Sequence, residues 1–190
     1  MAVQDDLRER ILADLFNLTR QESRIGIDAL DENDNMYELK STTRSQVSTA
    51  RDLGPNHIKK WKQRYWIVAN GVQDLGKFEI NSVYFLSSCH MAEWYHSIEE
   101  RFRKSIEINK MVMTALRNDP YFPHEHHETV EYVLGRGMLL NDPGIPWKYI
   151  VSNGILIEDD HAKQLRFLVS QYPIDQEYVH DPFGGCGLFY

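Results

Sequence analysis

The chain has 190 residues, of which 42% are hydrophobic and 12% aromatic. A chain of this length can bury a hydrophobic core within one compact domain, and this composition excludes a disordered or low-complexity protein. Its formal net charge of -7 argues by itself against a nucleic-acid partner, because affinity for phosphates comes from Lys and Arg.

Membrane proteins and disulfide-rich proteins are further classes that the sequence argues against. No apolar run approaches the ~20 residues that cross a bilayer, and residues 1–10 are too polar for the core of a signal peptide. We therefore expect a cytoplasmic protein with no membrane partner. Cys89 and Cys186 are far apart in sequence, so we expect two free thiols rather than a disulfide framework or a Cys-based zinc site.

The first predicted element is an amphipathic helix over residues 4–20. Its apolar side chains recur at helical spacing, and Asp5 and Asp6 suit the start of a helix. Such a helix can pack on the core of its own chain or on a second subunit, and the sequence leaves both arrangements open.

A hairpin, a helix and a strand follow. Residues 26–29 and 36–43 flank a polar cluster and are predicted to be two strands joined by a turn. Residues 55–64 are predicted to be a short helix that begins at a proline and is apolar inside and basic outside. Residues 66–69 are predicted to be a buried strand that ends in a turn at residues 70–71.

The chain has no internal repeat and no linker rich enough in Pro, Gly or Ser to mark a domain boundary, so we treat residues 1–190 as a single domain; the elements of its second half follow. Its predicted elements are a strand over residues 78–86, a long helix over 92–116 that is either continuous or broken, a short helix over 129–134, a hairpin formed by 147–151 and 155–157, and a final helix over 161–171. The glycine-rich end is expected to be irregular.

Charge is distributed unevenly along the chain. Residues 41–64 contain six Lys and Arg residues against one Asp, a net charge of +5, so the rest of the chain carries -12. A basic strip of this kind can bind a polyanion despite an acidic total. A solvated protein face is the other explanation of such a run.

One group of charged residues suggests chemistry. In a strand the side chains alternate, so Glu38 and Lys40 share one face while Leu39 points to the core. Asp28 lies ten residues earlier, where the hairpin brings it opposite Glu38. Carboxylates hold hard divalent cations that activate water for phosphodiester hydrolysis, and a lysine can orient or help deprotonate that water and offset phosphate charge. Chance alternation of charges on an exposed strand is the competing explanation.

The polar turn at residues 31–35 imitates the start of a calcium-binding loop, with oxygen-bearing side chains at alternate positions. Met36 stands where such a loop needs glycine, and Thr42 stands where it needs glutamate. We therefore interpret Asp31 and Asp34 as turn residues rather than metal ligands.

Two blocks of the sequence, residues 26–70 and 141–157, resemble Type II restriction endonucleases of the PD-(D/E)xK superfamily, and within it the PvuII family. The resemblance is carried by the hairpin from Asp28 to Ser41 without a gap, by Ser48-Thr49, Pro55, Ile58, Lys60, Gln63 and Trp66-Ile67, and by Pro143-x-Ile145-Pro146-x-Lys148-Tyr149 followed by Gly154.

The resemblance implies an α/β (α+β) fold with a central mixed β-sheet flanked by helices. It implies an enzyme whose catalytic residues are Asp28, Glu38 and Lys40, with Mg²⁺, which Mn²⁺ can replace, bound by Asp28, Glu38 and Leu39. Such an enzyme hydrolyses both strands of double-stranded DNA at a short palindromic site as a homodimer. A DNA methyltransferase of the same specificity is its functional partner.

The same resemblance divides the domain. Residues 4–20 join the subunits, residues 26–70 form the catalytic hairpin and the basic helix, and residues 141–190 form a C-terminal recognition segment. Residues 71–140 have no counterpart in the resemblance and are treated as variable.

DNA contacts are carried over from the family to two segments, which gives Ser48, Arg51, Asp52, Asn141 and Asp142 as DNA-binding residues. Arg51 and Asp52 replace adjacent histidines of the family's pattern, so a different sequence is expected to be recognised. Arg suits guanine and Asp can accept a hydrogen bond from cytosine, which favours G·C pairs. A salt bridge between these two side chains is the equal alternative.

Several other residues invite a functional interpretation. Trp61 replaces a tyrosine that lies near the active site in the family. Residues 124–127 are rich in histidine, but with no Cys or acidic partner suggested we expect an exposed loop rather than a metal site. His57 and the adjacent Cys89 and His90 are expected to be structural.

Alternatives remain open at two levels. The helix over residues 92–116 is interpreted as a packed helix, with Arg101, Arg103 and Lys104 as phosphate contacts in the other interpretation. The whole protein can also be a structure-directed repair or recombination nuclease of the same fold, or a DNA-binding module without catalysis.

Overall fold

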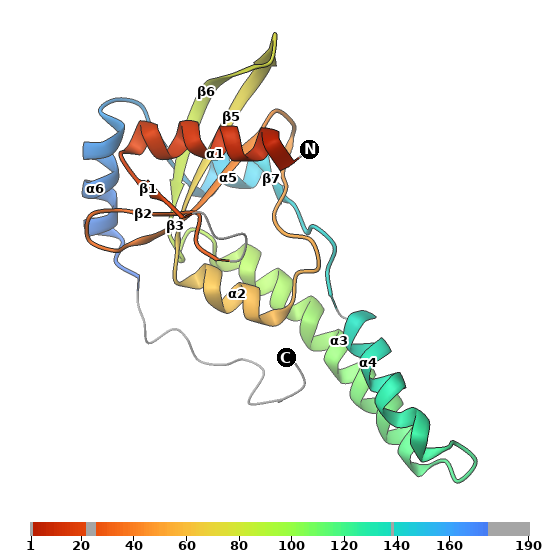
Figure 1. The fold of residues 1–190 in the computed structure, drawn as a ribbon. Helices are drawn as coiled ribbons and strands as arrows, with labels where there is room; N and C mark the ends of the chain where they lie inside the picture. Colours follow the sequence, from red (N-terminus) through yellow and green to blue (C-terminus); the bar gives the residue numbers. More distant parts are fainter. Residues whose placement is uncertain (1, 22–25, 138, 175–190) are drawn as a thin grey trace.

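The protein is an α+β structure built on a mixed sheet with helices on both faces (Figure 1). The computed structural model describes residues 2–21, 26–137 and 139–174. In the sheet β3 and β5 are parallel, and the other neighbouring strands are antiparallel. The predicted central mixed sheet is confirmed. Across this sheet the order is β1 (Thr19–Arg20), β2 (Ala29–Leu30), β3 (Met36–Thr42), β5 (Tyr65–Asp74), β6 (Lys77–Leu86) and β8 (Ile155–Ile157).

Helices cover the two faces of this sheet. Helices α1 and α6 pack on one face, and α2, α3 and α5 pack on the other. The final helix agrees with its prediction at both ends, and the predicted helices at residues 55–64 and 92–116 are confirmed within two residues. The bounds are α1 (Ala2–Phe16), α2 (Pro55–Lys62), α3 (Ala92–Asn118), α4 (His127–Gly137), α5 (Trp147–Asn153) and α6 (His161–Gln171).

The central strand β5 is buried on both sides, which gives the sheet a core on each face. Tyr65 and Ile67 contribute to the core under α1 and α6. Trp66 and Val68 contribute to the opposite core, because successive side chains of a strand point to opposite faces. A strand covered on both faces has a continuous apolar sequence, as residues 65–69 do.

The N-terminal helix is shorter than predicted. Asn17 has a positive φ of 55°, and the Leu18 N–H donates to the Ala13 carbonyl at 2.9 Å, which ends a helix in the way that a left-handed asparagine commonly does. Residues 19–20 form β1 and pair with β2. The prediction of a helix through residue 20 is wrong, because the apolar spacing continues past the residue that ends the helix.

The hairpin of β2 and β3 is confirmed, and Asp31 holds its turn. One carboxylate oxygen of Asp31 accepts the N–H groups of Asn33 and Asn35 at 2.9 and 3.0 Å. The other oxygen accepts the Asn35 side chain and the Tyr37 hydroxyl, both at 2.9 Å. Asp31 is therefore a turn residue, as predicted.

Replacing Asp31 by alanine is expected to lower the free energy of unfolding by about 1–2 kcal/mol, because several turn groups lose their acceptor. Burial disfavours the Asp31 carboxylate, but its hydrogen bonds hold its pKa below the ordinary value of 3.8. The stabilisation is therefore present above that value and is lost as the pH falls through the folded-state pKa. Urea unfolding at several pH values measures both effects, with the exposed Asp34→Asn as the control.

β5 continues beyond its predicted end. The chain reverses at Leu75 and Gly76, whose φ angles are 44° and 83°, so β5 and β6 form a long ribbon that projects from the sheet (Figure 1). The register shifts at Asn70 and Gly71, and a Cβ on Gly71 would lie 2.2 Å from the Glu79 carbonyl oxygen. The prediction of a turn at residues 70–71 is wrong. Gly71 instead permits the close approach of the β5 and β6 backbones.

α3 is a single unbroken helix that leaves the sheet and forms an arm with α4 (Figure 1). Its N-terminal half contributes Trp94, Tyr95, Ile98 and Phe102 to the core. α4 is longer than the helix predicted at residues 129–134, and none of its described side chains is buried.

Residues 147–151 are helical rather than the first strand of a hairpin. They belong to α5, which begins directly after Pro146 and buries Ile150. β8 pairs with β6 instead. The hairpin prediction is wrong because a short apolar run fits a helix and a strand equally well; the strand at residues 155–157 is confirmed.

A second, two-stranded sheet joins β4 (Gln46–Val47) to β7 (Ile145–Pro146). Next to it, Leu53 and Leu140 exchange main-chain hydrogen bonds of 2.8 and 2.9 Å. Residues 46–53 therefore lie beside residues 140–146, far away in sequence.

Within the described residues, no helix is both long and apolar enough to cross a bilayer. The glycine-rich end of the chain and Cys186 lie outside the described residues, so the irregular end stays a prediction.

Candidate active site

The hairpin places Asp28 beside β3, at the edge where β2 begins. The Asp28 N–H donates to the Tyr37 carbonyl at 3.2 Å, and one carboxylate oxygen, Oδ2, accepts the Leu39 N–H at 2.8 Å. Two main-chain contacts thus fix the residue against the strand that carries Glu38 and Lys40.

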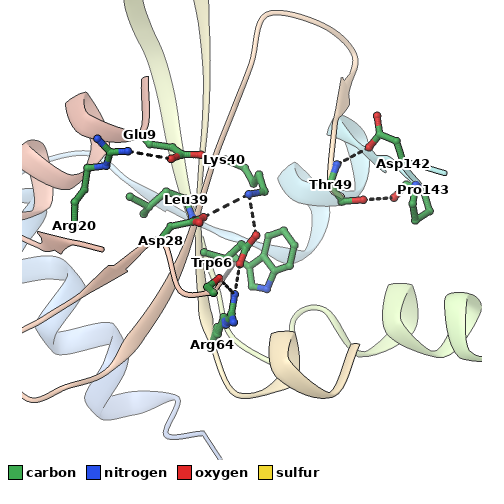
Figure 2. Close-up of polar contacts among 12 residues, drawn as sticks. Glu9, Arg20, Asp28, Leu39, Lys40, Thr49, Arg64, Trp66, Asp142 and Pro143 are labelled. Atoms are coloured by element: carbon green, nitrogen blue, oxygen red, sulfur yellow. Dashed lines mark hydrogen bonds and ion pairs between the residues drawn. The ribbon is translucent and has the colours of Figure 1, made fainter. Parts of the chain in front are cut away.

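The structure brings Asp28, Glu38 and Lys40 together, and Figure 2 shows Asp28 and Lys40 of this group beside Arg64. Lys40 Nζ lies 2.8 Å from Glu38 Oε1 and 3.4 Å from Asp28 Oδ2. Glu38 is buried, and the Lys40 side chain is only 17% exposed. Both carboxylates therefore converge on the Lys40 ammonium, and the three side chains are largely shielded from solvent.

Arg64 is a fourth member of this group. Its NH1 donates to Glu38 Oε2 at 2.7 Å and to the Gly26 carbonyl at 2.8 Å, and the residue is buried. In the sequence Arg64 was only one of the charges in the basic strip. The one available signal was its position directly before the apolar residues of β5, where a charged side chain requires a buried partner.

The charge states follow from these contacts. Burial raises the pKa of Asp28, Lys40 opposes this, and the nearby Glu38 adds to it. Burial also disfavours ionised Glu38, but Lys40 and Arg64 together hold the pKa of Glu38 below its ordinary value. Burial disfavours the Lys40 ammonium, yet the two carboxylates outweigh it and raise the pKa of Lys40. At neutral pH Glu38 is therefore anionic and Lys40 cationic.

The site has the donors of a hard-cation site. Lys40 Nζ already lies within reach of both carboxylates. The N–H and C=O of one strand residue point to the same edge, so the Leu39 carbonyl lies on the edge that faces Asp28. In the described parts of the chain no three His, Cys, Asp or Glu side chains lie close enough together to hold a metal ion. The available set is two carboxylates and one main-chain carbonyl, which are oxygen ligands of the kind that Mg²⁺ takes.

The family model described as "Restriction endonuclease PvuII" matches residues 3–118, more than half of the chain. The chain belongs to the PvuII restriction endonuclease family. The match includes Asp28, Glu38, Lys40 and Arg64, and it extends over residues 71–118, for which the sequence showed no counterpart. No curated protein matches the chain.

The residues predicted to contact DNA lie on two segments of this PvuII-family chain, residues 46–53 and 140–146. We call them the paired segments, because β4 pairs with β7 and Leu53 with Leu140. The Thr49 N–H donates to Asp142 Oδ1 at 2.6 Å, and the Thr49 hydroxyl donates to the Pro143 carbonyl at 3.2 Å. The Asp142 N–H donates to the Ala50 carbonyl at 3.1 Å. Figure 2 shows Thr49, Asp142 and Pro143 to one side of the Asp28 and Lys40 group. The two predicted DNA-binding segments thus form one unit, held together by hydrogen bonds.

Four of the five predicted DNA-binding side chains are exposed: Ser48, Arg51, Asp52 and Asn141. In residues 26–137, no ion pair joins Arg51 to Asp52, so the alternative in which they pair with each other has no support in the structure. Asp52 has a positive φ of 52°, which aspartate tolerates better than most residues. Asp142 differs from these four because its carboxylate already accepts a main-chain N–H.

Trp61 lies in the core beneath the sheet. It is buried in an aromatic cluster, with ring centroids 5.2 Å from Trp66 and 5.9 Å from Trp94. His57 Nδ1 accepts the Gly54 N–H at 3.1 Å at the start of α2, and His90 Nδ1 accepts the Ser87 N–H at 3.0 Å. Each ring thus accepts a hydrogen bond that orders the local backbone.

The arm carries the other predicted sites. Residues 124–127 form η1 (His124–His126) and the start of α4, and Phe122 stacks on His127. Arg103 forms ion pairs of 2.9 and 2.7 Å with Glu100 and Glu107. Arg103, one of the three predicted alternative phosphate contacts, is therefore engaged in ion pairs within its own helix.

Proposed function

We propose that this protein is a Type II restriction endonuclease that hydrolyses both strands of double-stranded DNA at a short palindromic site, using Mg²⁺, for which Mn²⁺ can substitute. The observation that carries the proposal is the convergence of Asp28 and Glu38 on the Lys40 ammonium, within the hairpin of a PvuII-family chain.

Each residue has a distinct role in this proposal. Asp28, Glu38 and the Leu39 carbonyl hold the metal ion, which polarises the scissile phosphate and lowers the pKa of a water molecule. Lys40, which is protonated in the free protein, orients the attacking water and offsets negative charge on the phosphate. Arg64 keeps Glu38 anionic and in place. The low exposure of the group strengthens these electrostatic interactions.

The paired segments supply DNA contacts next to this site. Ser48, Arg51, Asp52 and Asn141 present exposed polar side chains from one surface unit, and Arg51 with Asp52 favours G·C pairs. A palindromic site requires two copies of this unit, so we propose a homodimer. In the cell, a methyltransferase of the same specificity would protect the host DNA.

Asp142 is proposed to act by holding this unit together. Asp142→Ala is expected to weaken DNA binding about tenfold, because the Thr49 N–H loses its acceptor and alanine resists the positive φ of 44°. Asp142→Asn keeps an oxygen acceptor and tolerates that φ, so it should bind almost as the wild type does. Fluorescence anisotropy on duplex DNA with Ca²⁺ measures this difference; equal losses in both variants would instead indicate that the carboxylate charge contacts DNA.

Digestion of DNA tests the proposal directly. A long unmethylated DNA of known sequence is incubated with the purified protein and Mg²⁺, or with EDTA, and the fragment ends are sequenced. We expect discrete, metal-dependent fragments whose ends share one palindrome. Random degradation would favour a structure-directed nuclease, and binding without cleavage under Mg²⁺ and Mn²⁺ would favour a DNA-binding module.

A further inference from the structure

We propose that Arg64 sets the metal affinity of the active site. It fixes one oxygen of Glu38 and balances the charge of the group, so that the free protein binds a divalent cation weakly. This inference rests on the proposed function, because it requires Asp28 and Glu38 to hold the cation.

Arg64 is held in place by two acceptors. Its NH1 donates to Glu38 Oε2 at 2.7 Å and to the Gly26 carbonyl at 2.8 Å. The Arg64 and Glu38 side chains are each 7% exposed. Leaving this position would separate a buried guanidinium from a buried carboxylate, which is strongly unfavourable.

Lys40 is placed differently. It contacts the other Glu38 oxygen, Oε1, at 2.8 Å and Asp28 at 3.4 Å, and it is more exposed than Arg64. An incoming cation would therefore compete with Lys40 for Oε1 and for the Asp28 carboxylate. It would not displace Arg64 from Oε2. Arg64 thus determines which oxygen of Glu38 is available.

Charge balance gives Arg64 its second effect. Asp28 and Glu38 provide two negative charges when ionised, and Lys40 and Arg64 provide two positive charges, so the group is neutral overall. A positive charge within a few ångströms of a cation site lowers affinity by about tenfold or more at the effective dielectric of a protein. A DNA phosphate adds negative charge to this neutral group, so metal binding is strengthened when substrate is present.

Two substitutions at Arg64 separate its charge from its hydrogen bond. A cavity of about 340 Å³ borders it, lined also by Gln21, Lys60 and Gln63. Glutamine and lysine are both smaller than arginine, and each keeps an N–H donor for Glu38. Arg64→Gln removes the charge, whereas Arg64→Lys retains it, so the pair separates charge from hydrogen bonding.

Titration of the free protein with Mn²⁺, followed by the electron paramagnetic resonance signal of unbound Mn²⁺, tests the inference without any cleavage. We expect Arg64→Gln to bind Mn²⁺ about tenfold more tightly than the wild type. Arg64→Lys should stay near the wild-type affinity. Arg166→Gln, which removes an exposed charge from α6, serves as the control and should have no effect.

Two results would overturn the role of Arg64. One is an unchanged or weaker Mn²⁺ affinity in Arg64→Gln, and the other is the same change in Arg64→Gln and Arg64→Lys, which a purely structural role would produce. Asp28→Asn, made in the Arg64→Gln background, distinguishes this failure from that of the proposed function. If Mn²⁺ binding does not depend on Asp28, the cation site itself is misplaced and the proposed function loses its metal site.

Discussion

Replacing Lys40 by alanine is expected to lower the rate of DNA cleavage by about 10³-fold while DNA binding is retained. The Lys40 ammonium contacts both carboxylates of the group, so its loss removes a positive charge that would face the scissile phosphate. The protein should still fold, because Glu38 keeps Arg64 and Asp28 keeps the Leu39 N–H as partners.

Three measurements check this expectation. Cleavage rates are measured on the DNA that the wild type cuts, DNA affinity is measured by anisotropy with Ca²⁺, and thermal unfolding verifies the fold. Lys77→Ala, at the exposed start of β6, is the matched control and should cut at the wild-type rate. Wild-type cleavage by Lys40→Ala would remove Lys40 from the mechanism.

The catalytic hairpin could be predicted because local rules determine it. A polar turn joins two short strands, and the strand period of two puts Glu38 and Lys40 on one face. The antiparallel register of Ala29 and Tyr37, extended by one residue, then puts Asp28 opposite Glu38, and its carboxylate accepts the Leu39 N–H. Each of these steps depends on residues within about one hairpin length, so the sequence alone carries enough information.

Arg64 could not be assigned in the same way, because its contacts depend on long-range packing. It follows α2, and the parallel pairing of β3 with β5 puts Glu38 opposite Trp66. This register brings residue 64 next to Glu38 and Gly26, and nothing in the local sequence specifies it. The hydrogen bond between Thr49 and Asp142 could not be predicted for the same reason. Each segment resembled a stretch that contacts DNA, but only the tertiary structure brings the two segments together.

The errors in secondary structure have local causes. Asn17 ended a helix whose apolar spacing continued, and Gly71 marked a close approach between β5 and β6 where a turn was expected. At residues 147–151, four apolar positions were too few to distinguish the period of a helix from that of a strand. None of these errors affected the residues that form the candidate active site.

Glu38→Gln is expected to abolish cleavage and also to destabilise the free protein by about 3–5 kcal/mol. Its carboxylate is the partner of both Lys40 and Arg64, and a neutral amide removes the negative charge that both cations contact. Asp28→Asn should likewise abolish cleavage, but at a cost of about 1 kcal/mol in stability, because an amide oxygen still accepts the Leu39 N–H.

The contrast between these two carboxylates tests the arrangement of the whole group. Urea unfolding in EDTA measures stability without any metal ion, and digestion of DNA with Mg²⁺ measures activity. Equal stability losses in Glu38→Gln and Asp28→Asn would contradict a central position of Glu38 between two cations. Retained cleavage in either variant would contradict the proposed metal site. A large loss of stability for Glu38→Gln alone, with loss of cleavage in both, would show that one carboxylate both holds the fold and serves the chemistry.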